Sequence, residues 1–391
     1  MYLSLPKWVL FFQYQENVNF KEVLKLKILL AGGGTAGHIN PALAIAGFAI
    51  DKNPDTKVLF VGTRRGLEST LVPKQGYDIE YVNVEGLSKK LTLKNMKSLY
   101  HMLTAKSKCK KIIKKFSPDV VIGTGGYVCA PAVMAANSMG IPTIIHEQNV
   151  FPGSAIKLLS KKSSVTAISF EESRKYLSGA KNIVFTGNPI RPSVLSFNRD
   201  EARKNLNAND KKLIVIFGGS LGAAKINSVA LSYIKNKSYP ENAMIIFATG
   251  ERNFEEIKNQ IKTENIVLGK NINLVSYIHN MDEVLNAADL VVCRSGAITV
   301  SELSALGKPA ILVPSPNVTN NHQEYNARAL SDNGAAITIL EKDFNEQTLK
   351  KAVDSILLSE EAQIKMSEKS IAISSVSALD IIHSKIEELI K

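Results

Sequence analysis

Short apolar runs alternate with longer amphipathic segments along the whole chain. In the first half, runs typical of buried strands lie at 27–31, 57–62, 79–84, 119–122, 142–146, 164–168 and 183–186. In the second half they lie at 213–217, 244–249, 272–275, 289–293, 310–313 and 336–339. Alternating strands and helices are typical of parallel sheets with helices on both faces. Two such series predict two doubly wound α/β domains.

Each series opens with a strand, a glycine loop and a helix. The first loop, 32–37, leads into a helix expected from about Pro41, because proline suits the first helical position. The second loop, 218–222, leads into a helix expected from about Ala223.

The predicted boundary between the domains lies near residues 187–192, where one glycine and two prolines interrupt regular structure. We expect domains at 26–187 and 188–375, followed by a C-terminal helix at 376–391 that packs back on the first domain. This helix carries Leu379, Ile382, Ile386 and Leu389 on one face. Residues 1–25 show no clear period, and their status as an added helix or a start-site artefact stays open.

Composition supports an ordinary globular protein. The 391 residues are 45% hydrophobic and 21% charged, which excludes disordered, collagen-like and coiled-coil chains. Three cysteines are too few and too scattered for a disulfide framework or a zinc cluster, and they suit a reducing cytoplasm.

Two stretches raise the question of a membrane. The apolar run 8–12 is too short for the core of a signal peptide. The stretch 120–145 has 26 residues without a charged side chain, which is long enough to span a bilayer. Its glycines and prolines instead favour a strand, a glycine loop, a buried helix and a second strand.

The net charge of +12 is concentrated in one place. Residues 86–118 contain ten lysines and no acidic residue, so this stretch carries +10. It could bind nucleic acid, dock on an anionic membrane or form a solvated helix face. Only Tyr100 and Phe116 are aromatic there, which disfavours nucleic acid because bases stack on aromatic rings.

The glycine loops indicate phosphate binding or, alternatively, plain tight turns. Ligands of doubly wound sheets bind at the carboxyl ends of strands, where backbone amides and a helix N-terminus meet phosphate. The loop 32–37 also matches the dinucleotide pattern Gly-x-Gly-x-x-Gly. The second strand is followed by Arg64 and Arg65 rather than an acid, which disfavours NAD but leaves an NADP-dependent oxidoreductase open.

The segment 289–328 adds two candidate features. Glu302 follows a strand and a Ser-Gly turn, where it could complement the helix dipole or bind vicinal ribose hydroxyls. The polar cluster 320–326 could bind a sugar or cap a helix.

With these blocks in order, the chain resembles the MurG family of bacterial peptidoglycan N-acetylglucosaminyltransferases. The blocks are Gly33–His38 with Pro41, Gly123–Tyr127, His146–Asn149, Gly187–Arg191, Gly218–Ala223, Arg294–Glu302, and His322–Gln323 with Asn326. The resemblance covers the chain from Lys27 almost to the C-terminus.

The resemblance implies a GT-B fold, with two Rossmann-like domains facing a cleft. It implies inverting transfer of GlcNAc from UDP-GlcNAc to the 4-hydroxyl of MurNAc in lipid I, which yields lipid II and UDP. The first domain would face the acceptor and the membrane, and the second would bind UDP-GlcNAc. A UDP-GlcNAc epimerase and a glycolipid transferase are the nearest alternatives within this fold.

The resemblance also assigns site residues. His38 is the candidate general base, with helix capping as its alternative role, and Glu147 is the second candidate. The donor-binding residues are expected to be Thr35, Ala36, Gly37, Asn149, Arg191, Ser220, Ile278, Ala297, Ile298, Thr299, Val300, Ser301, Glu302 and Gln323. No Asp-x-Asp sequence occurs, which agrees with a reaction that needs no metal, and no other cofactor is expected.

The expected partners are UDP-GlcNAc, lipid I and an anionic inner-membrane surface, without nucleic acid. Because the acceptor is a lipid, the lysine-rich stretch favours a peripheral enzyme on the cytoplasmic face of the bacterial cell membrane. A solvated helix face stays the alternative role of these lysines.

Overall fold

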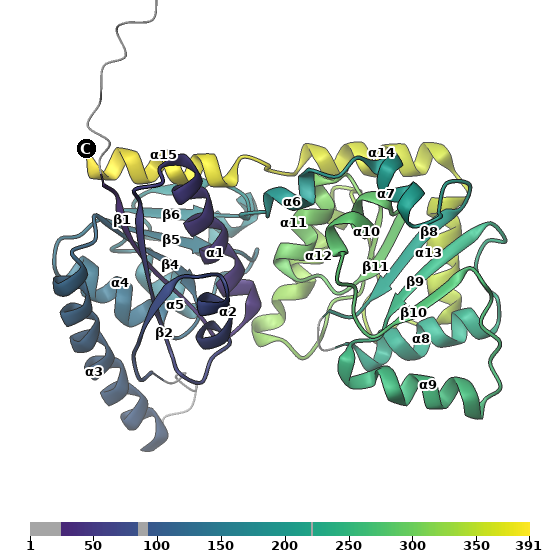
Figure 1. Ribbon diagram of the computed structural model, residues 1–391, viewed down its shortest axis with the longest axis horizontal. Helices are drawn as coiled ribbons and strands as arrows, with labels where there is room; N and C mark the ends of the chain where they lie inside the picture. Colours follow the sequence, from purple (N-terminus) through teal and green to yellow (C-terminus); the bar gives the residue numbers. More distant parts are fainter. Residues whose placement is uncertain (1–24, 85–92, 220–221) are drawn as a thin grey trace, which may run out of the picture.

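Two parallel sheets lie side by side, each covered by helices on both faces (Figure 1). The computed structural model describes residues 25–84, 93–219 and 222–391, with only the backbone described for 93–99. Residues 1–24 of the predicted N-terminal extension therefore lie outside the described part. The predicted fold class of two Rossmann-like doubly wound domains is confirmed.

The first sheet has the strand order β3-β2-β1-β4-β5-β6-β7. Its strands are β1 (Lys27–Gly32), β2 (Lys57–Gly62), β3 (Asp78–Tyr81), β4 (Val120–Gly125), β5 (Thr143–Glu147), β6 (Val165–Ile168) and β7 (Ile183–Phe185). The connecting helices are α1 (Ala36–Lys52), α2 (Glu68–Lys74), α3 (Leu93–Phe116), α4 (Cys129–Asn137), α5 (Ser154–Leu159) and the 3-10 helix Glu171–Tyr176.

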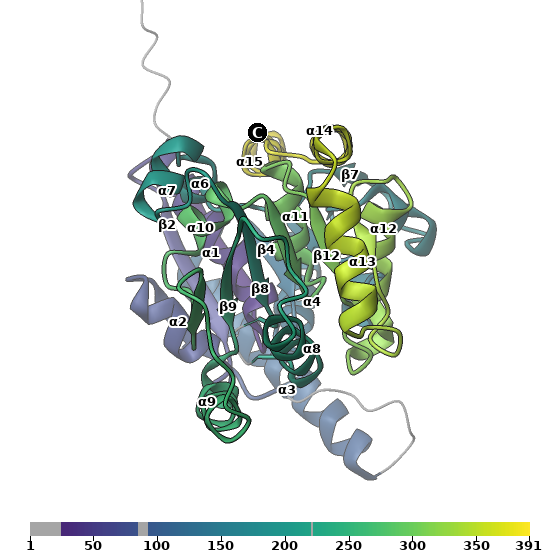
Figure 2. The same cartoon turned by 90° about the vertical axis from the view of Figure 1, so that its right-hand side faces the viewer.

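The second sheet has the strand order β10-β9-β8-β11-β12-β13. Its strands are β8 (Lys212–Phe217), β9 (Ala243–Ala248), β10 (Ile272–Val275), β11 (Leu290–Cys293), β12 (Ala310–Leu312) and β13 (Ile337–Thr338). Its helices are α6 (Pro192–Leu195), α7 (Arg199–Asn205), α8 (Ala224–Lys235), α9 (Phe254–Thr263), α10 (Met281–Ala287), α11 (Ala297–Ala305), α12 (His322–Ser331), α13 (Glu346–Leu357) and α14 (Glu360–Ala372). In the turned view of Figure 2, α8 and α13 lie on one side of β8 and β9, and α10 lies on the other.

The central strands are apolar throughout because both of their faces are buried. In β1, Ile28 and Leu30 enter the core beneath α1, whereas Leu29 and Ala31 enter the core beneath α3 and α4. The uncharged stretch 120–145 forms β4, α4 and the start of β5, as its glycines and prolines predicted. No helix in the described ranges has the length and apolar character needed to cross a bilayer.

The helix after the first glycine loop begins earlier than predicted. It starts at Ala36, so Pro41 lies inside α1, and the expectation that Pro41 is the first helical residue is wrong. Because proline has no amide hydrogen, Pro41 removes the one intrahelical bond that would reach the carbonyl of Gly37. The second helix, α8, begins at Ala224, one residue from its expected start.

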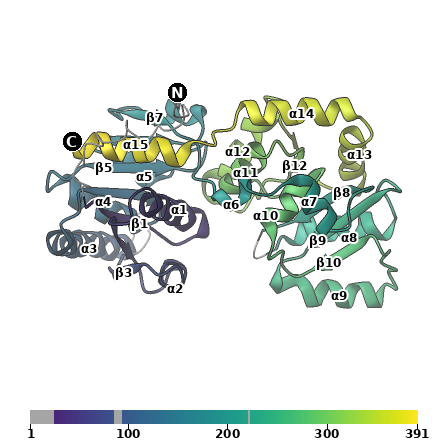
Figure 3. The ribbon, with the colours of Figure 1, turned by 45° about the horizontal axis from the view of Figure 1, so that its top comes forward.

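The chain ends on the first domain rather than the second. A connection from α14 crosses to α15 (Ala378–Ile390), which lies along the first domain (Figure 3). Leu379, Ile382 and Ile386 of this helix join the core formed by β1 and α1, and Lys52 lies 3.3 Å from Asp380. The last helix therefore completes the core of the first domain.

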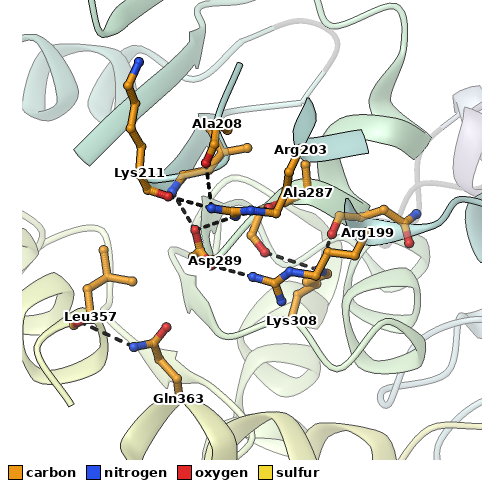
Figure 4. Close-up of polar contacts among 12 residues, drawn as sticks. Arg199, Arg203, Ala208, Lys211, Ala287, Asp289, Lys308, Leu357 and Gln363 are labelled. Carbon is orange, nitrogen blue, oxygen red and sulfur yellow. Dashed lines mark hydrogen bonds and ion pairs between the residues drawn. The ribbon is translucent and has the colours of Figure 1, made fainter. Parts of the chain in front are cut away.

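A buried ionic cluster fixes α7 to the second sheet (Figure 4). Asp289 accepts hydrogen bonds from Arg199 (2.6 Å), Arg203 (2.9 Å) and the amide of Leu213 (2.7 Å). The ammonium group of Lys308 donates to two backbone carbonyls nearby, and burial lowers the pKa of Lys308 to about 7. Because Asp289 and Lys308 precede strands, the cluster lies at the edge opposite the carboxyl ends and has a structural role.

Candidate active site

The carboxyl ends of both sheets converge where the two domains meet. In both sheets the order of the strands changes direction beside the first strand, since β1 lies between β2 and β4 and β8 lies between β9 and β11. The two glycine loops follow β1 and β8. This switch point is where doubly wound sheets bind ligands.

The first glycine loop packs tightly against the loop after β4 at Gly33. The amide of Gly33 donates to the carbonyl of Gly125 at 3.3 Å. A Cβ atom on Gly126 would lie 2.1 Å from the oxygen of Gly33. Gly34 has a φ of +84°, a conformation that glycine adopts without strain. These glycines allow the loops after β1 and β4 to lie directly against each other.

His38 is oriented by this loop. Its Nδ1 atom lies 3.1 Å from the carbonyl oxygen of Gly33 and 3.2 Å from Oγ1 of Thr35. Because a carbonyl only accepts, Nδ1 carries the proton and Nε2 has a free lone pair. Burial lowers the pKa of His38, and a smaller opposing effect comes from the bond to Gly33. The imidazole is therefore neutral near pH 7 and has the protonation state of a general base.

A buried carboxylate that we did not predict holds the same loop. Glu68, at the start of α2, is 1% exposed and accepts bonds from the Gly34 amide (2.9 Å), the Thr63 amide (2.9 Å) and the Thr63 hydroxyl (2.7 Å). Burial raises the pKa of Glu68, but these donors outweigh burial and keep the pKa below its ordinary value. Glu68 lies three residues beyond Arg65, past the position at which the dinucleotide pattern places an acid.

Glu147, the second candidate base, lies beneath a turn. It ends β5, is 2% exposed and accepts bonds from the amide (2.9 Å) and side chain (3.1 Å) of Asn149 and from the Gly153 amide (2.8 Å). Burial raises the pKa of Glu147. Both carboxylate oxygens are thus engaged within the turn 149–153.

In the second domain the structure brings Arg191 and Glu302 together. Nη2 of Arg191 lies 3.4 Å from Oε1 of Glu302 and 2.7 Å from Oδ1 of Asp282, a residue that the sequence did not single out. Burial raises the pKa of Glu302, and Arg191 opposes this effect. Residues 297–301 form the first turns of α11, so the N-terminus of this helix lies beside the carboxylate.

The remaining predicted donor residues of the second domain are Ile278, Ser220 and Gln323. Ile278 is buried in the core after β10, and Ser220 lies outside the described residues. Gln323 accepts from the Ser315 amide through Oε1 at 2.9 Å, which fixes its side chain at the N-terminus of α12. A cavity of about 570 Å³ opens beside it, lined by Lys225, Pro314, Pro316, Asn321, Glu324, Leu340, Glu341 and Lys342.

The two halves of the site touch through the loop after β5. Oδ1 of Asn149 accepts from Nδ2 of Asn326 in α12 at 3.1 Å. His322, also in α12, is close enough to His38 to lower its pKa. Thr35, Ala36 and Gly37 are exposed at the start of α1, on the same side as His38. Among the residues described, no group of three or more His, Cys, Asp or Glu side chains could hold a metal ion.

Known proteins similar to this chain match both domains. Residues 28–168 match the N-terminal domain of glycosyltransferase family 28, and residues 213–383 match its C-terminal domain. A Thermoanaerobacter protein is 44% identical over 93% of this chain and 100% of its own length. An Acetivibrio thermocellus protein is 45% identical over 94% and 99%. Both are named UDP-N-acetylglucosamine–N-acetylmuramyl-(pentapeptide) pyrophosphoryl-undecaprenol N-acetylglucosamine transferase.

Solved structures agree with this relationship. MurG from Acinetobacter baumannii superposes with a TM-score of 0.75 at 26% identity, covering 93% of this chain and 99% of that one. A UDP-GlcNAc 2-epimerase from Neisseria meningitidis shares the fold alone, with a TM-score of 0.65 at 16% identity, covering 93% and 100% of the two chains. The chain therefore belongs to glycosyltransferase family 28 and, as the resemblance predicted, to the MurG proteins within it.

Proposed function

We propose that the chain transfers GlcNAc from UDP-GlcNAc to the 4-hydroxyl of MurNAc in lipid I, which releases UDP and forms lipid II. Close similarity over nearly the full length of the named transferases carries this proposal. The proximity of His38 in the first domain to His322 of α12 in the second domain supports it, because the reaction joins two large substrates between two binding surfaces.

The second domain binds the donor. Glu302 accepts from the ribose hydroxyls, and Arg191 favours the ionised form of its carboxylate. The backbone at Ile278 meets the uracil edge, and Ala297, Ile298, Thr299, Val300 and Ser301 form the turns beneath the nucleotide. Ser220 and the glycine loop meet the diphosphate, and Gln323 binds GlcNAc hydroxyls. From the first domain, Thr35, Ala36, Gly37 and Asn149 close over the sugar.

The chemical step needs one base and one set of anion-stabilising groups. Nε2 of His38 takes the proton of the acceptor 4-hydroxyl as its oxygen attacks the anomeric carbon. The bond from that carbon to the UDP oxygen breaks on the opposite face, so the configuration inverts. Arg191, backbone amides and a helix N-terminus stabilise the negative charge that develops on UDP. With no Asp-x-Asp sequence to hold a metal, these groups serve in its place.

Helix α3 attaches the first domain to an anionic membrane surface. Ala105, Cys109, Ile112 and Ile113 of this helix enter the core, while Lys108, Lys111, Lys114 and Lys115 are exposed. Tyr100 and Leu103 are 66% and 60% exposed and can enter the headgroup region. The side chains of Lys89, Lys90, Lys94 and Lys97 lie outside those described. Peripheral attachment at the cytoplasmic face would place the site beside its lipid acceptor.

A defined assay tests this function. Purified protein is incubated with UDP-GlcNAc and a soluble lipid I analogue, with and without EDTA, and products are separated by chromatography. We expect disaccharide and UDP in equal amounts and the same rate with EDTA. Conversion of UDP-GlcNAc to an epimer, without transfer to the acceptor, would overturn the proposal in favour of the epimerase alternative.

A further inference from the structure

One helix carries both a donor-site side chain and the contacts with the other domain. Gln323 lies at the N-terminus of α12 beside the 570 Å³ cavity. Tyr325 and Asn326, on the next turn, contact the first domain. The sequence predicts a sugar-binding or helix-capping role for the polar cluster 320–326, but the structure places the side chain of Asn326 in the interdomain contact.

The side chain of Asn326 is fully buried and bonds to both domains. Its Oδ1 atom accepts from the amide of Val150 at 3.0 Å. Its Nδ2 atom donates to Oδ1 of Asn149 at 3.1 Å and to the carbonyl of Ser295 at 3.2 Å. Only a primary amide accepts and donates in this arrangement, so aspartate could not replace it.

An aromatic contact lies beside this amide. The rings of Phe151 and Tyr325 stack with centroids 5.3 Å apart and an interplanar angle of 25°. Tyr176 packs on Phe151 at 4.8 Å, and the ammonium group of Lys157 lies 3.8 Å from the centroid of the Phe151 ring. Tyr176 and Lys157 of the first domain therefore hold the Phe151 ring in place against Tyr325.

The partner loop is fixed in advance of this contact. Glu147 accepts three hydrogen bonds from Asn149 and Gly153, so the turn that carries Val150 and Phe151 is held to β5. A rigid turn loses little conformational entropy when the domains meet.

We propose that Asn326 and Tyr325 form an interdomain latch with residues 149–151 that positions α12, and with it Gln323, against the first domain. The two are positioning residues, because they contact neither the donor nor the acceptor in the mechanism above. The kinetic part of this inference rests on the proposed function, whereas the structural part does not.

A distance measurement tests the latch without reference to activity. Spin labels are attached at Ser107→Cys in α3 and Thr263→Cys in α9, exposed positions on opposite domains, and their separation is measured by double electron–electron resonance. The three native cysteines are buried, with thiol pKa values raised to about 12, and should remain unlabelled. We expect Asn326→Asp and Tyr325→Ala to broaden the distribution and shift it to longer distances.

A matched variant separates the latch from general destabilisation. Asn271 is a partly buried asparagine of the same domain that donates to the Ala243 carbonyl within its own sheet, so Asn271→Asp should leave the distances unchanged. In the transferase assay, the latch variants should lower kcat roughly tenfold, as expected for lost interdomain hydrogen bonds, with an unchanged Kd for UDP.

The outcomes distinguish the two proposals. A parental distance distribution in both folded latch variants would overturn the latch. Longer distances in the latch variants, together with a parental protein that transfers no sugar, would support the latch but contradict the proposed function. If UDP binding by the latch variants weakened in proportion to their loss of turnover, the latch would also be overturned, because Asn326 would then act on the donor site directly.

Discussion

The imidazole ring of His38 lies directly against the backbone of Gly125, where an added Cβ atom would stand 2.6 Å from Cδ2 of the ring. Gly125 ends β4 with a φ of +109°, and His38 belongs to α1 after β1. The two neighbouring strands of the switch point thus fix the candidate base from both sides.

Substituting Gly125 should therefore impair turnover more than stability. We expect Gly125→Ala to displace the ring of His38 and lower kcat on the order of 10²-fold, since small misplacements of catalytic groups have effects of this size. Gly140→Ala is the matched control, because Gly140 also has a positive φ (+74°) but open space around it. Thermal unfolding and kcat are measured for both. Equal kcat values in the two variants would contradict the positioning role of Gly125.

Removing the imidazole should lower kcat with little effect on the donor. We expect His38→Ala to reduce kcat by about 10²-fold or more, the usual contribution of a positioned base. Because burial lowers the pKa of His38, the parental kcat should stay constant down to about pH 6.5, the ordinary histidine pKa, and fall only below it. Turnover of the variant close to the parental rate would transfer the role to another base.

Glu302 should govern donor affinity. We expect Glu302→Ala to raise the Kd for UDP, measured by isothermal titration calorimetry, because the ribose hydroxyls lose their acceptor. Asp282→Asn should raise the Kd for UDP less, since it weakens only the ion pair between residue 282 and Arg191. UDP binding by Glu302→Ala with parental affinity would show that the ribose assignment is wrong.

Glu68 should stabilise the first glycine loop in a pH-dependent way. Glu68→Gln replaces one of the two acceptor oxygens with an amide donor, so either the Gly34 amide or the Thr63 amide loses its acceptor, which should lower the free energy of unfolding by about 1–3 kcal/mol. The folded pKa of Glu68 lies below its ordinary value, so its stabilisation is present above about pH 4.3 and is lost as the pH falls through the folded pKa. Thermal unfolding of both proteins between pH 3 and 7 should show their difference shrinking at the acid end.

Membrane binding should depend on the lysines of α3. We expect binding to vesicles rich in anionic lipid, weak binding to neutral ones, and release by about 0.5 M salt, because each lysine contributes about 1 kcal/mol and is screened. Replacing Lys108, Lys110, Lys111, Lys114 and Lys115 with Gln should reduce binding but preserve turnover of a soluble lipid I analogue.

The control replaces five exposed lysines of the second domain, Lys204, Lys262, Lys270, Lys351 and Lys365. It has the same net charge as the α3 variant but should keep most of the binding, which is measured by vesicle co-sedimentation. An equal loss in both variants would mean that total charge, and not the surface of α3, drives attachment.

The sequence predicted the sheets well because buried parallel strands are continuous apolar runs. Strands such as β1, β2 and β10 lie where the runs predicted, and most others differ by one or two residues at an end. The predicted helix start at Pro41 is wrong, because α1 begins at Ala36 and accommodates the proline in its interior.

The sequence carries weaker signals for the tertiary contacts that assemble the site than for the strands. Glu68 is a single acid without a motif, and its role depends on where two loops meet in space. Asn326 and Val150 are 176 residues apart, so no local pattern could pair them. Glu147 was a candidate base by sequence, but its three hydrogen bonds depend on the turn that follows it.

The return of α15 to the first domain has a consequence for biosynthesis. The ribosome synthesises the whole second domain before α15, the helix that packs against α1 and β1. Until α15 is made, the first domain therefore has an uncovered apolar groove. The second domain can fold first, because its core does not depend on the C-terminal helix. Leu379, Ile382 and Ile386 then close the groove, and a nascent chain cut short before them would expose it to chaperones and proteases.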